Sequence, residues 1–130
     1  MKLIDLLFSF RGRIGRTTFW ILLFGISVVM TLAAVVVAFA VDSMVRLGLL
    51  GPVSPHIVAF VAVGIPCLWP LIAVQVKRWH DLNCSGWWFF INLIPMVGNI
   101  VSLVMCGFVA GTGGTNKYGQ VPEGPFRIGA

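Results

Sequence analysis

The residues best suited to chemistry lie in one short segment, residues 77–88. Within it, Arg78, His80 and Asp81 place a guanidinium, an imidazole and a carboxylate close together in the sequence. Such a set could handle a proton, with Asp81 fixing the tautomer of His80, or hold an anionic headgroup through Arg78. A metal is a further alternative because His80 and Cys84 are four residues apart, but zinc sites use four ligands and only two are offered here. We therefore expect no metal and no cofactor.

The same segment has a simpler interpretation as a loop beside a membrane. Its positive charges would orient the preceding helix, and Ser85 or Asp81 would cap the following one. Trp87 and Trp88 would anchor that helix at the membrane interface. The segment offers neither a nucleophile paired with a base nor two carboxylates, which are the usual catalytic sets. The pattern favours a protein that is not an enzyme.

A second group of cations, Arg11, Arg13 and Arg16, stands directly before a long apolar segment. A basic cluster can bind nucleic acid, but beside a membrane span it more simply meets anionic lipid, at about 1 kcal/mol per basic residue. Leu3 and Phe8 lie upstream and can belong to the apolar face of a short helix in the interface. We expect membrane lipids with anionic headgroups as partners, and no nucleic acid.

A third group, Asn116, Lys117 and Tyr118, lies in the glycine-rich segment 111–119. A phosphate-binding loop of the Walker type requires glycine, lysine and then serine or threonine. Here asparagine precedes the lysine and tyrosine follows it, so that interpretation fails. We predict a flexible turn.

The composition shows what kind of protein must position these groups. The chain has 130 residues, of which 58% are hydrophobic and only 10% are charged, and its mean hydropathy is +0.99. Soluble domains are about 45–50% apolar and about 25% charged. The uncharged stretches 17–41, 47–76 and 82–116 are each long enough to cross a bilayer, which takes about 20 residues. The composition therefore predicts an integral membrane protein.

The predicted fold is an all-α, polytopic transmembrane helical bundle with a short N-terminal interfacial helix. The third span carries Pro95 and Asn99 near its middle, so we expect it to be broken near Pro95–Asn99. It could be one kinked span or a hairpin, and we favour three spans. The single membrane domain, 1–130, comprises a basic segment over 1–16, spans over 19–41, 57–76 and 87–110, and a tail over 111–130.

The orientation follows from the basic residues near short loops. They gather in the N-terminal segment and in the loop 77–86, which we place in the cytoplasm, with the loop 42–56 outside. Three clean spans would also put the tail outside, whereas a hairpin would return it to the cytoplasm.

Four motifs, taken in order, resemble the domain-of-unknown-function 805 family of small bacterial inner-membrane proteins. They are Phe10-Arg11-Gly12-Arg13 with Arg16 and Phe19-Trp20, Lys77-Arg78-Trp79-His80-Asp81 with Ser85-Gly86-Trp87-Trp88, Ile94-Pro95-x-x-Gly98, and Gly111-Thr112-x-Gly114-x-Asn116-Lys117-Tyr118-Gly119 with Pro122. The family usually has arginine where this chain has Lys77 and leucine where it has Trp79. The resemblance implies a multi-pass protein of the bacterial inner membrane and implies no activity.

The candidate site is either a ligand or headgroup site or a polar cluster between loops. It consists of Arg11, Arg13, Arg16, Arg78, His80, Asp81, Asn116, Lys117 and Tyr118. We expect Asp81 to pair with Arg78 or with an arginine of the N-terminal block.

Three functions remain open at this point. The favoured one is a non-enzymatic accessory module that binds lipid or a partner protein. The second is a small transporter or channel subunit acting as a homo-oligomer, since broken helices and buried asparagines can line a pathway. The third is a membrane enzyme that uses His80 and Asp81 on a lipid-linked substrate.

Overall fold

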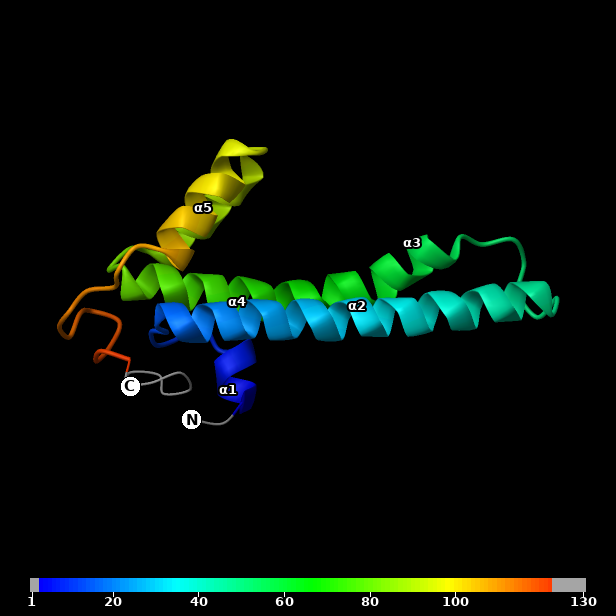
Figure 1. Cartoon of the computed structure of the whole chain (residues 1–130), viewed down its shortest axis with the longest axis horizontal. Coiled ribbons are helices and arrows are strands. Elements are labelled where there is room, and N and C mark those ends of the chain that lie inside the picture. The colour runs from blue at the N-terminus through cyan, green and yellow to red at the C-terminus, as the bar shows by residue number, and fades with distance from the viewer. Residues whose placement is uncertain (1–2, 123–130) are drawn as a thin grey trace. The chain divides into compact units, whose positions relative to one another are not determined.

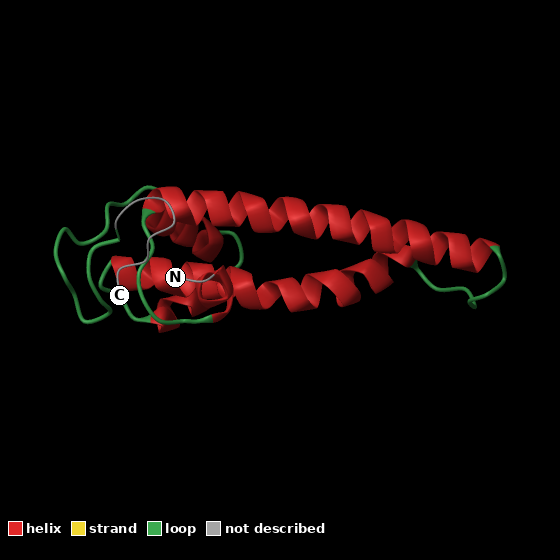
Figure 2. Cartoon of the chain, turned by 90° about the horizontal axis from the view of Figure 1, so that it is seen from below, coloured by secondary structure: helices red, strands yellow, loops and turns green. Residues whose placement is uncertain are grey.

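The computed structural model describes residues 3–122. Lys2, Glu123 and Arg127, with the outer ends of the predicted segments 1–16 and 111–130, lie outside the described residues. Within the described range the regular elements are helices, and no strand forms (Figures 1 and 2). The predicted all-α bundle with several apolar membrane helices is confirmed.

The helix α1, Leu3–Phe8, occupies the segment for which we predicted an interfacial helix. Its Leu3, Ile4 and Phe8 side chains are exposed, whereas Leu6 is buried. A short helix that buries one leucine and exposes three large apolar side chains suits the boundary between water and lipid.

The helix α2, Arg16–Arg46, is the first of two helices that are long and apolar enough to cross a membrane. It extends beyond the predicted span 19–41 at both ends. At its C-terminal end Asp42 and Arg46 form an ion pair of 2.7 Å one turn apart, which favours a further turn of helix. Gly48 then adopts a φ of 71°, a left-handed conformation that ends the helix.

The second such helix runs from Pro55 to Asp81. It consists of α3 (Pro55–Ala59), a π-helical turn η1 (Phe60–Gly64) and α4 (Ile65–Asp81). Pro66 and Pro70 lie inside it. Proline lacks the N–H that would bond four residues back, and the π turn directly before Pro66 is the kind of local adjustment by which a helix absorbs such a defect.

The third apolar segment forms two shorter helices, η2 (Gly86–Leu93, a 3₁₀ helix) and α5 (Val97–Gly107). The break falls at residues 94–96, at the start of the range Pro95–Asn99 in which we predicted it, and residues 97–99 already belong to α5. Ile94 is extended, as residues before proline prefer, and Met96 adopts a φ of 61°, so the chain reverses. Gly98 allows α5 to approach η2 closely, because a Cβ there would lie 1.7 Å from the carbonyl oxygen of Ile91.

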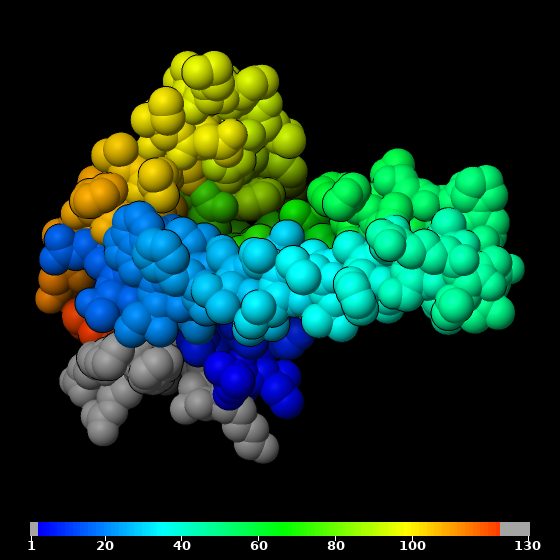
Figure 3. All heavy atoms as spheres, turned by 45° about the vertical axis from the view of Figure 1, so that its right-hand side comes forward, coloured from blue at the N-terminus to red at the C-terminus, as the bar shows by residue number. Residues whose placement is uncertain are grey.

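Both ends of this segment lie at the same end of α4. Gly86 packs against Val76, and the carbonyl of Cys106 accepts a hydrogen bond from Arg78. Of the two forms left open for residues 87–110, the structure has the hairpin instead of one continuous kinked span. Each arm is shorter than the roughly 20 residues that a span requires. Figure 3 shows the hairpin in yellow as a lobe beside the first turns of α2.

The chain divides into two compact units, and the candidate site belongs entirely to one of them. The first unit contains residues 1–23 and 70–130, and the second contains residues 24–69. In the first unit Leu6, Ile14 and Trp79 are buried together with several charged side chains. In the second unit most apolar side chains are exposed, as expected of a surface that faces lipid.

Candidate functional site

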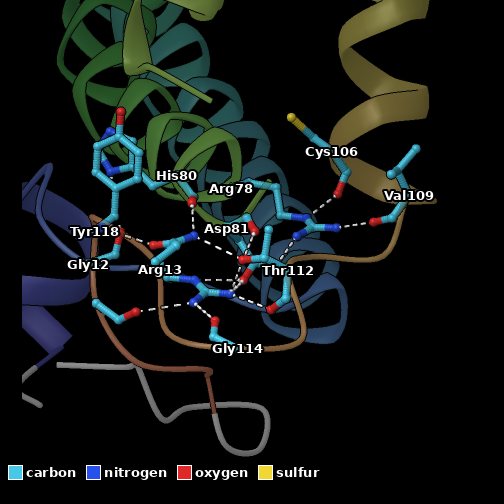
Figure 4. Close-up of polar contacts among 12 residues, drawn as sticks. Gly12, Arg13, Arg78, His80, Asp81, Cys106, Val109, Thr112, Gly114 and Tyr118 are labelled. Atoms are coloured by element: carbon cyan, nitrogen blue, oxygen red, sulfur yellow. Dashed lines mark hydrogen bonds and ion pairs between the residues drawn. The ribbon is translucent and has the colours of Figure 1, made fainter. Parts of the chain in front are cut away.

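Arg13 lies in the loop between α1 and α2 and has no exposed surface. Its Nε and Nη2 atoms donate to Oδ1 of Asp81 at 3.1 and 2.9 Å (Figure 4). Nη1 donates to the carbonyl oxygens of Gly114 and Gly119 at 2.8 and 3.1 Å. Nη2 also reaches the carbonyl and the hydroxyl of Thr112, each at 2.8 Å. All three guanidinium nitrogens are therefore bonded within the chain.

Arg78, in the last turn of α4, is equally buried. Its Nη1 forms an ion pair with Oδ2 of Asp81. Nε donates to the carbonyl oxygen of Cys106 at 2.6 Å, and Nη2 donates to that of Val109. These carbonyls belong to the end of α5 and the residues after it, so Arg78 joins the hairpin to α4.

Asp81 receives both arginines on its two carboxylate oxygens and is only 4% exposed. Its own carbonyl accepts the backbone N–H of Thr112 at 2.9 Å. Gly111 packs against the carboxylate, and a Cβ there would lie 1.9 Å from Oδ2. We call Arg13, Arg78 and Asp81 the lock. The expected pairing of Asp81 with an arginine is confirmed, and both candidate partners take part.

The charges of the lock do not cancel, since two guanidinium groups share one carboxylate. Backbone carbonyl oxygens supply the remaining acceptors, and charge-assisted hydrogen bonds of this kind are the stronger ones. Burial of paired charges is costly unless such additional bonds satisfy them. The lock therefore holds three parts of the chain together: the loop before α2, the end of α4, and the segment after α5.

His80 points away from the lock and stacks on Tyr118, with ring centroids 3.9 Å apart and planes 4° from parallel. Its Nδ1 lies 3.3 Å from the carbonyl oxygen of Gly12. The Nζ of Lys117 lies 5.0 Å from the centre of the Tyr118 ring, within the range of a cation–π contact. In the described part of the chain, His80 and Asp81 make no hydrogen bond to each other. The structure therefore does not contain the hydrogen-bonded pair in which Asp81 would fix the tautomer of His80.

Asn116 organises the glycine-rich segment. Its Nδ2 donates to the carbonyl of His80 at 2.9 Å and to the hydroxyl of Thr112 at 3.0 Å. Its Oδ1 accepts the backbone N–H of Tyr118 at 2.9 Å. Asn116 and Gly119 also exchange backbone hydrogen bonds. The segment predicted as a flexible turn is thus a hydrogen-bonded turn that presents Tyr118 to His80.

The structure separates the nine predicted site residues into two groups. Six of them converge on the lock and on the stack beside it: Arg13, Arg78, His80, Asp81, Asn116 and Tyr118. The other three, Arg11, Arg16 and Lys117, are exposed. Arg16 donates one hydrogen bond, from Nη1 to the carbonyl of Phe108 at 3.2 Å.

Two contributors were missed by the sequence analysis. Lys77 is buried, and its Nζ donates to the carbonyl oxygens of Asp5 and Leu6 at 2.7 and 2.6 Å, which attaches α1 to α4. Thr112 bonds Arg13, Asp81 and Asn116. The available signal for Lys77 was its position one helical turn before Asp81, which places both on one face of α4.

The flanking motif residues also have defined positions. Ser85 caps η2 by accepting a hydrogen bond from the backbone N–H of Trp87 at 3.4 Å. Of the two residues predicted as alternatives for this cap, Ser85 and Asp81, Ser85 is therefore the one that forms it. Trp88 stacks on the buried Trp79 with ring centroids 5.8 Å apart. Trp87 is exposed, as an interfacial anchor would be.

Comparison with known proteins places this chain among proteins without an assigned activity. The protein family described as "Protein of unknown function (DUF805)" matches residues 7–120. Uncharacterized protein YiiR of Escherichia coli K12 is 32% identical, covering 88% of this chain and 86% of its own. Inner membrane protein YhaH of the same strain is 29% identical over 95% of this chain and 94% of its own. Inner membrane protein YhaI, also of Escherichia coli K12, is 30% identical over 88% of this chain and 86% of its own. No solved structure matches.

The family match extends from α1 to the turn that carries Tyr118, and it therefore includes every residue of the lock. Two of the relatives bear the name of inner membrane proteins, in agreement with the two long apolar helices found here. The chain is a membrane protein of the DUF805 family, whose function is unknown.

Proposed function

We propose that this chain is a non-enzymatic membrane module that binds anionic lipid headgroups around the lock. The observation that carries the proposal is the division of the cations into two groups. Arg13 and Arg78 are buried and form hydrogen bonds within the chain. Three other cations lie exposed on the segments that the lock joins: Arg11, Arg16 and Lys117. Each exposed cation near an anionic membrane surface contributes about 1 kcal/mol.

The charge of the two ends of α2 supports an orientation. Around the lock the described chain has six basic residues, Arg11, Arg13, Arg16, Lys77, Arg78 and Lys117, against the acidic Asp5 and Asp81. At the other end of α2, Asp42 and Arg46 neutralise each other, and the loop 47–54 has no charge. The positive-inside rule then places the lock in the cytoplasm.

This orientation extends to the topology of the chain. We assign two crossings, by α2 and by Pro55–Asp81, and a hairpin that enters and leaves on the cytoplasmic side. The N-terminal segment, the loop after α4 and the tail to Pro122 then share one side, because Arg13, Asp81 and Thr112 are in contact. A reporter enzyme fused after Pro122 tests this topology, since it should be active only in its cytoplasmic form.

The enzyme alternative loses support from the same contacts. A general base must have its orienting partner and a path to its substrate. Both carboxylate oxygens of Asp81 are held by arginines, and His80 lies under Tyr118 with Nδ1 directed to Gly12. These contacts favour the non-enzymatic module over a membrane enzyme that uses His80 and Asp81.

Native mass spectrometry of the protein in mild detergent tests headgroup binding directly. Phosphatidylglycerol and phosphatidylcholine are added separately, and bound lipids are counted. We expect preferential binding of phosphatidylglycerol, and a variant with Arg11→Gln, Arg16→Gln and Lys117→Gln should lose about 100-fold in affinity for it.

The control variant is Arg46→Gln, because this arginine is 78% exposed but lies at the other end of α2. Its binding of phosphatidylglycerol should equal that of the unaltered chain. Equal binding of the two lipids, or a loss in Arg46→Gln as large as that in the triple variant, would refute the proposal.

A further inference from the structure

A pocket without charged lining residues lies within the first unit, apart from the lock. It has a volume of about 230 Å³ and is formed by the first turns of α2, the middle of α4 and the hairpin. Its polar lining consists of Gln75 from α4 and Asn92, Asn99 and Ser102 from the hairpin. Among residues 3–122, no charged side chain lines it. Amides are rare in apolar segments, and this pocket gathers three of them.

The hydrogen bonds of these amides are incomplete. Gln75 donates through Nε2 to the hydroxyl of Ser102, and Asn92 donates through Nδ2 to the carbonyl of Phe89 at 2.8 Å. Within the described residues, the side-chain carbonyl oxygens of Gln75 and Asn92 receive no donor, and the amide of Asn99 has no partner. Within the same residues, Gln75 and Asn92 also keep a second N–H without an acceptor, so the pocket presents three amides that can both accept and donate.

The surroundings make this deficit costly. Gln75 follows the apolar residues of α4, and the two asparagines flank the tip of an apolar hairpin. In hydrocarbon, an amide without a partner costs several kcal/mol, since no water is at hand to replace it. A species with its own donors must meet these groups when the protein is in a membrane.

We infer that the pocket binds a small neutral molecule with several hydroxyl groups. A hydroxyl both donates and accepts, so two or three of them on one small molecule match the free groups of Gln75, Asn92 and Asn99. The absence of charge on the pocket walls favours a neutral molecule, because an ion would stay unpaired there. Phe19 and Leu71 supply apolar walls against which the carbon chain of such a molecule can lie.

The size of the pocket agrees with this ligand class. A water molecule takes about 30 Å³ of liquid volume, so the pocket has the room of several waters or of one three-carbon polyol. Asn99, one of the lining residues, is exposed. This site is independent of the headgroup binding proposed above, because it shares no residue with the exposed cations.

Side-chain amide NMR signals of the full chain in nanodiscs test the inference, with glycerol as the probe. Titration with glycerol should give saturable shifts of the amide signals of Gln75, Asn92 and Asn99. The signals of Asn83 and Asn116, which lie outside the pocket, should not follow the same curve. Acetate, a charged probe of similar size, should produce no saturable shift.

Two variants and a control complete the experiment. Asn99→Leu should weaken glycerol binding about fivefold, the value of one hydrogen bond, whereas Val97→Leu, on the same helix but outside the lining, should not. If Asn99→Leu fails to fold, Leu103→Trp takes its place, because it fills the pocket from its wall. The inference would be overturned if the signals shifted linearly with glycerol concentration, or if all asparagines shifted equally. It would also be overturned if the pocket amides contacted only bulk water and glycerol had no effect on their signals.

Discussion

The two units of this protein are stabilised by different means. The first unit buries Arg13, Lys77, Arg78 and Asp81 and satisfies them with one another and with backbone carbonyls. In the second unit only Val41, Ala59 and Gly64 are buried, and its apolar side chains face outward. Lipid tails offer apolar contact at no cost, so the second unit needs few internal contacts, whereas polar groups beside the membrane must be paired within the protein. The comparison predicts that substitutions of one kind act differently in the two units.

The largest difference should come from the acidic residues. Asp81→Asn removes the carboxylate that pairs with both buried arginines, and such a loss costs about 3–5 kcal/mol. Asp42→Asn, in the second unit, breaks an exposed one-turn pair and should cost less than about 0.5 kcal/mol. Unfolding by denaturing detergent, followed by circular dichroism, measures both. Similar costs for the two variants would contradict the comparison.

The next effect concerns two of the glycines that follow α5, Gly111 and Gly113. A Cβ at Gly111 would overlap the Asp81 carboxylate, so Gly111→Ala should destabilise the first unit by about 1–3 kcal/mol. Gly113, two residues on, has open space around it, so Gly113→Ala serves as the matched control and should leave stability nearly unchanged. Proteolysis of the tail in detergent reports the effect, since release of the lock exposes this segment. Equal cleavage of the two variants would show that Gly111 does not hold the lock.

Two glycine-to-alanine substitutions, one in each unit, should change the stability of the protein in opposite directions. Gly98→Ala places a methyl group 1.7 Å from the carbonyl of Ile91 and should destabilise the hairpin by about 1–3 kcal/mol. Gly25→Ala, inside α2 with nothing within 4 Å, should stabilise by up to about 1 kcal/mol because alanine favours helix. Thermal unfolding of both variants decides the matter. Loss of stability in Gly25→Ala would mean that α2 is not a freely exposed helix there.

The smallest effect belongs to the stack of His80 on Tyr118. A double-mutant cycle with His80→Ala and Tyr118→Ala should give a coupling free energy of about 0.5–1.5 kcal/mol, as for other aromatic pairs. The cycle is measured by thermal unfolding in the same detergent. A cycle between Tyr118 and Phe39, an exposed residue of the second unit, provides the control and should give no coupling. A coupling near zero for the first cycle would remove the stack from the interactions that hold the tail.

Much of this architecture could be predicted from charge placement. The uncharged stretches located both long helices, and the pre-proline geometry at Ile94 explains why the break could be placed at Pro95. Asp81 is the only acidic residue among several cations of the motifs, so its pairing with an arginine followed from electrostatics alone.

Other features had no comparable signal in the sequence. A continuous third span and a hairpin have the same composition, and the choice depends on the positive φ of Met96 and the close approach of Gly98 to Ile91. The partners of Lys77 are backbone carbonyls, which every residue type possesses, so no residue pattern marks them. The same holds for the carbonyls of Gly114 and Gly119 that receive Arg13.

The sequence separation within the lock has a consequence for biosynthesis. Arg13 and Asp81 are 68 residues apart, and the carbonyl of Gly114 that also receives Arg13 lies 101 residues from it. A chain made from the N-terminus leaves the ribosome with this arginine free, and the carbonyl of Gly114 is synthesised only 101 residues later. In the orientation proposed above, Arg13 acts during insertion as a topogenic signal together with Arg11 and Arg16. Once Asp81 and Gly114 have been synthesised, the same guanidinium becomes part of the lock, so one side chain acts first in targeting and afterwards in folding.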